Sequence, residues 1–157
     1  MDIVFVHHAN RDIKDKPTQQ DLITDIGYRD CMLTAELLND DRVKGKLKAV
    51  YTSPFIRCRK TAELVNTYIK LPIIEDNRLN EFKSVEGESW VECQTRVEDC
   101  LNDIVSKYDD NDMVIVVTSG VNMAAFINKA YGIKPNKNAP FINIATCSPL
   151  IFKYSKR

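Results

Sequence analysis

The chain has no excess of charge of either sign: its 157 residues include 22 lysines and arginines and 22 aspartates and glutamates. Proteins that attract nucleic acid or an anionic membrane through their overall field carry a surplus of basic residues. Long apolar runs are also absent, and none approaches the roughly 20 residues that a membrane-spanning helix needs. We therefore expect neither nucleic acid nor a membrane as partner, and any anion site must be local.

Cysteine pairs with metal-binding or redox spacing are missing as well. The five cysteines are odd in number and widely spread, and no two of them form a Cys-x-x-Cys motif. This argues against a zinc site or a thioredoxin-like centre, and we interpret them as small core residues in a reducing cytoplasm. No basic region precedes the first apolar run, so we expect no signal peptide. We predict a cytoplasmic protein without a cofactor or a bound metal.

Strand-like and helix-like segments alternate along the sequence. The predicted strands cover residues 3–6, 48–52, 71–74 and 113–117, with a closing pair at 141–145 and 150–154. The predicted helices cover residues 21–39, 53–69, 88–108 and 120–131. Such alternation is typical of an α/β fold, here a three-layer α/β/α sandwich with a mostly parallel central sheet. We find no linker or internal repeat and expect one domain over residues 1–157.

Helix boundaries and faces can also be predicted. Ser53 is a good N-cap and Pro54 suits the first position of the helix that follows. Gly132 is the expected stop of the last helix. Apolar residues at helical spacing form a stripe on the helix predicted at 21–39. The residues of this stripe are Leu22, Ile26, Leu33, Leu37 and Leu38.

Both histidines of the chain, His7 and His8, stand where the first predicted strand ends. The carboxyl ends of strands are the usual place for chemistry in open α/β sheets. An imidazole there can act as a nucleophile, a base or a phosphate ligand. Because side chains of neighbouring strand residues point to opposite faces, we expect the two rings to lie apart rather than share a metal.

Three other polar positions fall at strand ends or helix starts. Arg57 lies in the first turn of its predicted helix, where free amides and a guanidinium suit phosphate, although such charge runs are usually solvated. Glu81 follows a short strand in a loop, where a lone glutamate is most often solvated. Ser119 and Gly120 form a strand-to-helix junction that can present amides to an anion, although a plain N-cap is the simpler interpretation.

Taken in order, these segments resemble the histidine phosphatase superfamily, the phosphoglycerate mutase-like enzymes. That family combines a strand ending in Arg-His-Gly with Leu-Thr-x-x-Gly, Ser-Pro-x-x-Arg-x-x-x-Thr-Ala, Leu-x-Glu and Ser-His-Gly segments. The corresponding stretches here are residues 6–10, 22–27, 53–62, 79–81 and 118–120, and residues 87–90 with Arg96 add to the likeness. The resemblance covers nearly the whole chain, and residues 53–62 are its most specific part.

The resemblance implies a role for each matching residue. His8 matches the nucleophile that takes the phosphoryl group, Arg57 an arginine that grips it, and Glu81 the proton donor to the leaving oxygen. Fixed donors around the phosphoryl group would stabilise its charge.

The departures from the family pattern fall in the same pocket. His7 replaces the family's arginine, Ala9 replaces its glycine, and Ser119 replaces its second catalytic histidine. We count His7 and Ser119 among the candidate phosphate contacts, and Arg11 as a hypothetical replacement for the missing arginine. Losing one such donor costs roughly 10²–10³ in rate.

Other phosphatase and nucleotide-binding patterns are absent. No cysteine has an arginine six positions later, and the chain has no Walker-type loop and no Gly-x-Ser-x-Gly elbow.

Two hypotheses remain open. In one, the protein is a pseudoenzyme that binds a phosphorylated small molecule or a phosphoprotein in a degraded pocket. In the other, it is a weak or specialised phosphomonoester phosphatase that works through a phosphohistidine on His8. The region 71–87 is short, which favours an open pocket for a small or protein-borne phosphate. The sequence does not specify the oligomeric state.

Overall fold

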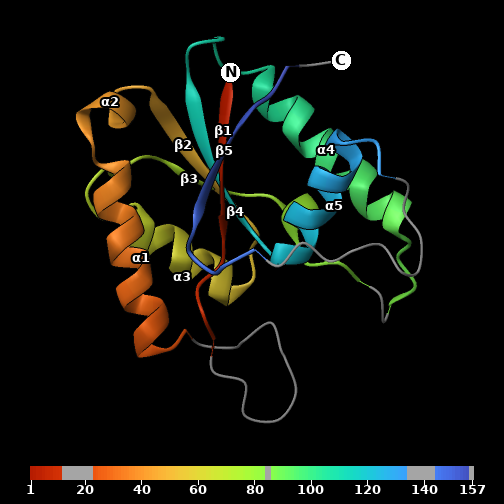
Figure 1. The fold of residues 1–157 in the computed structure, drawn as a ribbon, viewed down its shortest axis with the longest axis horizontal. Coiled ribbons are helices and arrows are strands. Elements are labelled where there is room, and N and C mark those ends of the chain that lie inside the picture. Colours follow the sequence, from red (N-terminus) through yellow and green to blue (C-terminus); the bar gives the residue numbers. More distant parts are fainter. Residues whose placement is uncertain (12–22, 84–85, 134–143, 156–157) are drawn as a thin grey trace.

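The computed structural model describes residues 1–11, 23–83, 86–133 and 144–155 (Figure 1). Its strands are β1 (Asp2–His7), β2 (Leu47–Thr52), β3 (Ile73–Glu75), β4 (Met113–Thr118) and β5 (Pro149–Lys153). Its helices are α1 (Asp25–Leu38), α2 (Asp41–Lys44), α3 (Ile56–Val65), the 3-10 turn η1 (Asn77–Leu79), α4 (Trp90–Val105) and α5 (Gly120–Ala130). Within these residues, no helix is long and apolar enough to cross a membrane.

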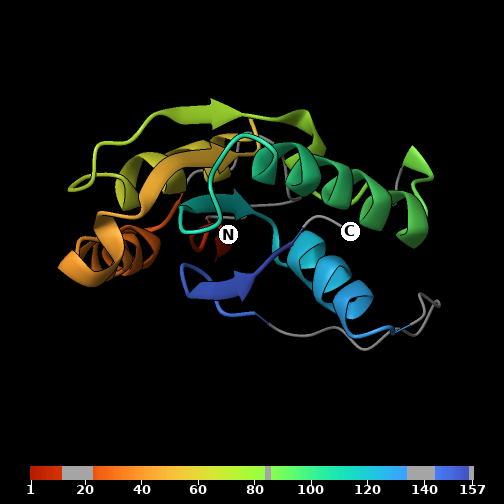
Figure 2. The same cartoon turned by 90° about the horizontal axis from the view of Figure 1, so that it is seen from above.

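Within the described residues, five strands form one sheet in the order β3-β2-β4-β1-β5. Neighbouring strands from β3 to β1 are parallel, and β5 alone runs antiparallel to β1. Helices α1 and α3 cover one face of the sheet and α4 and α5 cover the other (Figures 1 and 2). The predicted three-layer α/β/α fold with a mostly parallel sheet is therefore confirmed. In the register of β1 and β4, His7 pairs with Thr118, so both strands end side by side.

Alternating residues of β1 divide the core into two parts. Ile3 and Phe5 pack into the cluster beneath α4 and α5. Val4 and Val6 pack into the cluster beneath α1 and α3. All five cysteines are buried, in agreement with their interpretation as small core residues.

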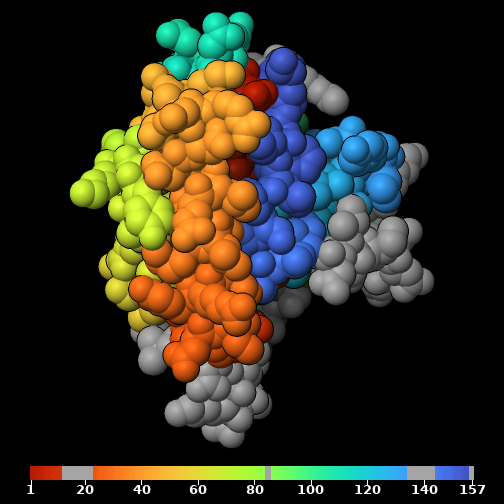
Figure 3. Space-filling view, turned by 60° about the vertical axis from the view of Figure 1, so that its left-hand side comes forward, coloured from red at the N-terminus to blue at the C-terminus, as the bar shows by residue number. Residues whose placement is uncertain are grey.

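Most of the apolar stripe of α1 does not face the core, and Leu38 is the stripe residue of this helix that does. Ile26, Leu33 and Leu37 are 67%, 53% and 62% exposed. Figure 3 shows α1 in orange at the surface beside β5 in blue. The residues that α1 buries are mostly small: Gly27, Cys31, Thr34, Ala35 and Leu38.

Close approach explains why small residues are buried. A Cβ at Gly27 would lie only 2.5 Å from the carbonyl oxygen of Asn10. Large side chains on this face would hold the helix away from the loop that follows β1. At this helix, the need for close contact with the loop after β1 decides which face is buried, and the spacing of the large apolar residues does not. Leu22, the first residue of the stripe, lies outside the described residues.

The start of α3 also differs from the prediction. The helix begins at Ile56 after the N-cap residue Phe55, which makes no side-chain cap hydrogen bond. The hydroxyl of Ser53 instead donates to Oδ1 of Asn80 at 2.7 Å. Ser53 therefore ties the end of β2 to a neighbouring loop and does not cap α3.

Two strands were predicted near the end of the chain, and the residues described there show one of them, β5. Of the predicted strand at 141–145, residues 141–143 lie outside the described residues, and Ile144 and Ala145 are not in a strand. Gly132 follows Tyr131, the C-cap of α5, and has a φ of +69°, as its predicted role as helix stop requires.

Candidate active site

Two imidazoles meet at the carboxyl ends of β1 and β4. The amide of His8 donates to the carbonyl of Thr118 at 3.0 Å, which extends the pairing one residue beyond β1. Nδ1 of His8 lies 2.9 Å from the carbonyl oxygen of Ala9, and Nδ1 of His7 lies 2.8 Å from that of Ile144. Because a carbonyl only accepts, Nδ1 is the protonated nitrogen of each ring. Nε2 of each neutral ring therefore keeps its lone pair.

The rings of His7 and His8 are in contact, contrary to the expectation that they lie apart. Their centroids are 4.6 Å apart and the planes are inclined at 71°. Strand β1 ends at His7, so strict alternation of side chains no longer holds at His8. No cluster of three or more His, Cys, Asp and Glu residues suited to a metal is present within the described parts of the chain.

Burial keeps both imidazoles neutral near pH 7. His8 is 5% exposed, and burial, reinforced by the neighbouring His7 and by Arg57 and Arg11, lowers its pKa to about 3. Burial also lowers the pKa of His7, and the carboxylate of Glu81 opposes part of that shift. A neutral His8 has the nucleophilic lone pair that an attack on phosphorus requires.

A threonine joins the histidine segment to the arginine helix. The amide of Ala9 donates to Oγ1 of Thr61 at 2.8 Å, and this hydroxyl donates to the carbonyl of Arg57 at 2.7 Å. The contact links residues that are 52 positions apart in the sequence. Arg57 is 1% exposed, and its charge lowers the pKa of both histidines. The structure thus brings His7, His8 and Arg57 into one region.

The guanidinium of Arg57 is engaged by Glu81. Nη2 of Arg57 lies 2.5 Å from Oε2 of Glu81, and its guanidinium carbon lies 4.9 Å from the ring centroid of Phe55. The side chain of Glu81 is 31% exposed, whereas that of Arg57 is buried. An ion-paired carboxylate accepts hydrogen bonds, so Glu81 has to leave this pair and take up a proton before it can donate one.

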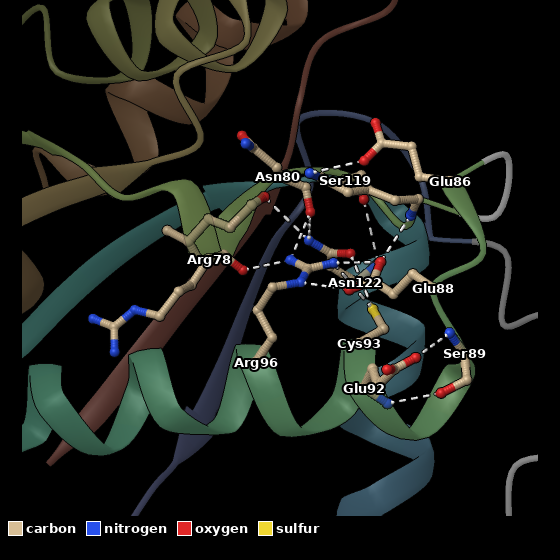
Figure 4. Close-up of polar contacts among 12 residues, drawn as sticks. Arg78, Asn80, Glu86, Glu88, Ser89, Glu92, Cys93, Arg96, Ser119 and Asn122 are labelled. Atoms are coloured by element: carbon tan, nitrogen blue, oxygen red, sulfur yellow. Dashed lines mark hydrogen bonds and ion pairs between the residues drawn. The ribbon is translucent and has the colours of Figure 1, made fainter.

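Side chains from three elements hold the loop that carries Glu81 (Figure 4). The carbonyl of Leu79 accepts from Oγ1 of Thr118 at 2.7 Å and from Nδ2 of Asn122 at 3.1 Å. The carbonyl of Asn80 accepts from the same Asn122 amide at 2.7 Å and from Nη1 of Arg96 at 2.8 Å. The carbonyl groups of the two residues before Glu81 are therefore each held by side-chain donors.

Arg96 is itself fixed by a carboxylate. Its Nε and Nη2 donate to the two oxygens of Glu88 at 2.7 Å and 2.9 Å, a bidentate ion pair. Ser89 and Glu92 form a capping box at the start of α4, which sets the helix that carries Arg96. The family-like segment 87–90 thus supports the Glu81 loop from a distance.

The two remaining candidates lie at the edge of this arrangement. Ser119 is 1% exposed and caps α5, where its hydroxyl accepts from the amide of Asn122 at 3.3 Å. This is the simpler of its two interpretations, and contact with a ligand stays a prediction. Arg11 is partly buried and pairs with Ile23 in an isolated bridge. Its charge lowers the pKa of both histidines, so it acts electrostatically on the site.

Sequence reasoning singled out neither Thr61 nor Asn122. Thr61 lies within the matched segment 53–62, so its place in the motif was a usable signal. Asn122 is fully buried and donates to two carbonyls of the Glu81 loop and to the hydroxyl of Thr118. In the sequence, it is an asparagine in the first turn of a predicted helix, and nothing there points to these contacts. Such a role becomes visible only once the loop and the helix are placed together.

The sequence profile of the histidine phosphatase superfamily (branch 1) matches residues 17–86 and 81–157. The chain belongs to this superfamily. The match begins ten residues after His7 and so leaves out the segment with both histidines. A search of curated proteins finds no match.

Solved structures share the fold at low sequence identity. YhfR of Bacillus stearothermophilus is 20% identical, with a TM-score of 0.77 over 96% of this chain and 89% of that one. A mycobacterial glucosyl-3-phosphoglycerate phosphatase in complex with VO3 is 17% identical, with a TM-score of 0.76 over 96% and 90%. The protein histidine phosphatase SixA in complex with tungstate is 17% identical, with a TM-score of 0.72 over 96% and 86%.

Replacing Thr61 tests the link between the two halves of the site. Thr61→Val keeps the side-chain shape but leaves the buried amide of Ala9 without an acceptor. We expect the free energy of unfolding to fall by about 2 kcal/mol, the usual cost of such a group. Thr61→Ser retains the hydroxyl and should lose less than half as much. Urea unfolding of the three proteins measures this, and equal losses in both variants would contradict the role of the hydroxyl.

The burial of His8 predicts a pH-dependent stability. In the unfolded chain His8 takes up a proton below pH 6.5, whereas the folded protein resists protonation until about pH 3. Acid therefore favours unfolding, and His8 alone should remove about 2 kcal/mol of stability between pH 6.5 and pH 5. Urea unfolding at both pH values should show a smaller loss in His8→Gln. The same loss in the variant would contradict the burial of a neutral imidazole.

Proposed function

We propose that this protein binds a phosphorylated ligand in the pocket formed by His7, His8, Arg57 and Glu81, and that its turnover of that ligand is impaired. In this proposal it is a phospho-ligand-binding pseudoenzyme of the histidine phosphatase superfamily. The ligand is a phosphorylated small molecule or a phosphoprotein.

Anion binding is supported by the arrangement of one guanidinium and two imidazoles at the same edge of the sheet. The observation that carries the proposal is the buried Arg57, joined through Thr61 to the segment with both histidines. A guanidinium with two imidazoles nearby suits the oxygens of a phosphate group. Oxyanions occupy two of the similar solved structures, VO3 in the mycobacterial phosphatase and tungstate in SixA. These structures support the choice of ligand class.

Impaired turnover is supported by three features of the pocket. At neutral pH His7 is uncharged where the family has a permanently charged arginine. The residue in place of the second catalytic histidine is Ser119, whose hydroxyl is engaged as a helix cap. The candidate proton donor Glu81 is held in an ion pair with Arg57. Each change weakens the stabilisation of charge in the transition state or delays proton transfer.

One observation favours the second candidate, a weak phosphomonoester phosphatase. His8 is neutral, and its Nδ1 is fixed by the carbonyl of Ala9, so its Nε2 is free to attack. In that reaction the Nε2–P bond forms, the bond from phosphorus to the ester oxygen breaks, and protonated Glu81 gives its proton to the leaving oxygen. Water then attacks the phosphohistidine, releases inorganic phosphate and returns a proton to Glu81.

Arginine variants test the binding part of the proposal. We expect orthovanadate to bind the wild-type protein and Arg57→Ala to weaken this binding about 10- to 100-fold, the usual contribution of a charge-assisted contact. Arg59→Ala is the matched control, since Arg59 lies on the same helix, is exposed and pairs with Glu75 at 3.0 Å. It should bind as wild type does. Isothermal titration calorimetry gives the affinities, and circular dichroism checks the fold.

Turnover of p-nitrophenyl phosphate, measured on the same proteins, distinguishes the pseudoenzyme from the weak phosphatase. The pseudoenzyme predicts no acid-labile phosphoenzyme and a rate far below the roughly 1–10³ s⁻¹ of ordinary enzymes. Slow turnover with a phosphoenzyme that disappears in His8→Ala favours the phosphatase. Turnover within the ordinary range would contradict impairment. Failure of the wild-type protein to bind orthovanadate would contradict the proposal as a whole.

A further inference from the structure

The imidazole of His7 lies directly against the start of α5. A Cβ built on Gly120 would lie 2.8 Å from Cε1 of His7 and 3.1 Å from both ring nitrogens. A Cβ contact shorter than 3.0 Å is essentially never seen, so a side chain at position 120 would force the ring of His7 to shift. Gly120 is the first residue of α5, where the backbone amides favour a bound anion and by themselves oppose a positive charge on the neighbouring imidazole.

The position of the ring connects it to the neighbouring strand. Strand β4 ends at Thr118, which pairs with His7, and the next residue along the chain is Ser119, the N-cap of α5. His7 therefore lies on β1 beside the position where the family resemblance places a second histidine. Its ring touches that of His8, with 4.6 Å between the centroids.

The two rings are fixed in the same way but differ in surroundings. Each Nδ1 is held by a backbone carbonyl, of Ile144 for His7 and of Ala9 for His8, so each ring leaves Nε2 for a ligand. His8 is buried, whereas His7 is partly exposed. Burial acts most strongly on His7 and lowers its pKa. The carbonyl of Ile144 and the carboxylate of Glu81 raise that pKa, whereas the charges of Arg11 and Arg57 lower it.

We propose that His7 is the second phosphoryl-contacting imidazole of the pocket, supplied by β1 in place of one at position 119 and seated on Gly120. This inference rests on the proposed function. His8 remains neutral and faces phosphorus with its lone pair, while His7 takes up a proton on Nε2 when a dianion binds and donates it in a hydrogen bond to an oxygen of the anion. No covalent bond changes in this step, and the proton comes from solvent.

Physical reasons favour His7 rather than His8 as the proton acceptor. A dianion raises the pKa of both imidazoles, but the ring that is more exposed loses less solvation on becoming charged. Glu81 already acts on His7 in the same direction. Because their surroundings differ, His7 becomes the cationic donor and His8 remains the neutral nucleophile.

Proton uptake on binding of tungstate tests this division. Tungstate stays a dianion throughout the neutral range, so it brings no proton of its own. We expect calorimetric titration at pH 7.5 in two buffers of different ionisation enthalpy to show uptake of about one proton by wild type. His7→Gln retains a neutral donor and should lose this uptake, with binding about 10- to 100-fold weaker. His8→Gln should keep it.

A glycine variant tests the seat of the ring without changing either histidine. Gly120→Ala should displace the ring and reduce proton uptake as His7→Gln does. Gly45→Ala is its control, because a Cβ at Gly45 would meet nothing within 4 Å, and it should bind tungstate with wild-type uptake. If His7→Gln does not fold, the Gly120→Ala result decides.

Each remaining result contradicts the inference. If wild type binds tungstate without taking up a proton, or if uptake survives both His7→Gln and Gly120→Ala, the role of His7 is wrong while the proposed function stands. Loss of uptake in His8→Gln but not in His7→Gln would assign the proton to the other ring. If tungstate does not bind to wild type at all, the proposed function fails and this inference fails with it.

Discussion

The hydrogen bond from the amide of Ala9 to the hydroxyl of Thr61 is the contact on which the candidate site depends. It joins the segment after β1 to α3, and the same hydroxyl continues to the carbonyl of Arg57. Parallel pairing of β1 with β4 and of β4 with β2 brings the strand ends to one edge of the sheet. The threonine then fixes how far the arginine lies from the histidines. Without this link, the two halves of the site would share an edge but no defined geometry.

Charge is the second constraint on the candidate site. Burial favours neutral imidazoles, and the permanent cation Arg57 is balanced by Glu81. Such a site presents positive charge to an anion in one of two ways. Either Glu81 moves away and leaves the guanidinium of Arg57 to the anion, or an imidazole takes up a proton when the anion binds. The family pattern, with an arginine at position 7 and a histidine at position 119, carries more of its charge in advance. This difference in charge explains why our proposal retains binding of the phosphorylated ligand but assigns the protein an impaired turnover.

The fold could largely be predicted from the sequence because buried parallel strands give continuous apolar runs, as in β1 and β4, and helices between them follow from chain order. The face of α1 could not, since close contact near Gly27 selects small residues over the apolar stripe. The start of α3 was mispredicted because Ser53 has a partner, Asn80, that is distant in the sequence. For the site, motif order named His7, His8, Arg57 and Glu81, which the structure brings together, although their roles remain proposals. The contact of the two imidazole rings was mispredicted, because the alternation of strand side chains was applied to His8, which lies beyond the end of β1 at His7.

The most direct measurement of the central claim is a crystal structure of the protein grown with orthovanadate. The account predicts an oxyanion within about 3.2 Å of both Nε2 of His8 and the guanidinium of Arg57, the distance of a hydrogen bond or closer. It further predicts that Glu81 no longer pairs with Arg57 in the same way once the anion is bound. An empty pocket in crystals that hold vanadate elsewhere, or an anion bound away from both residues, would contradict it.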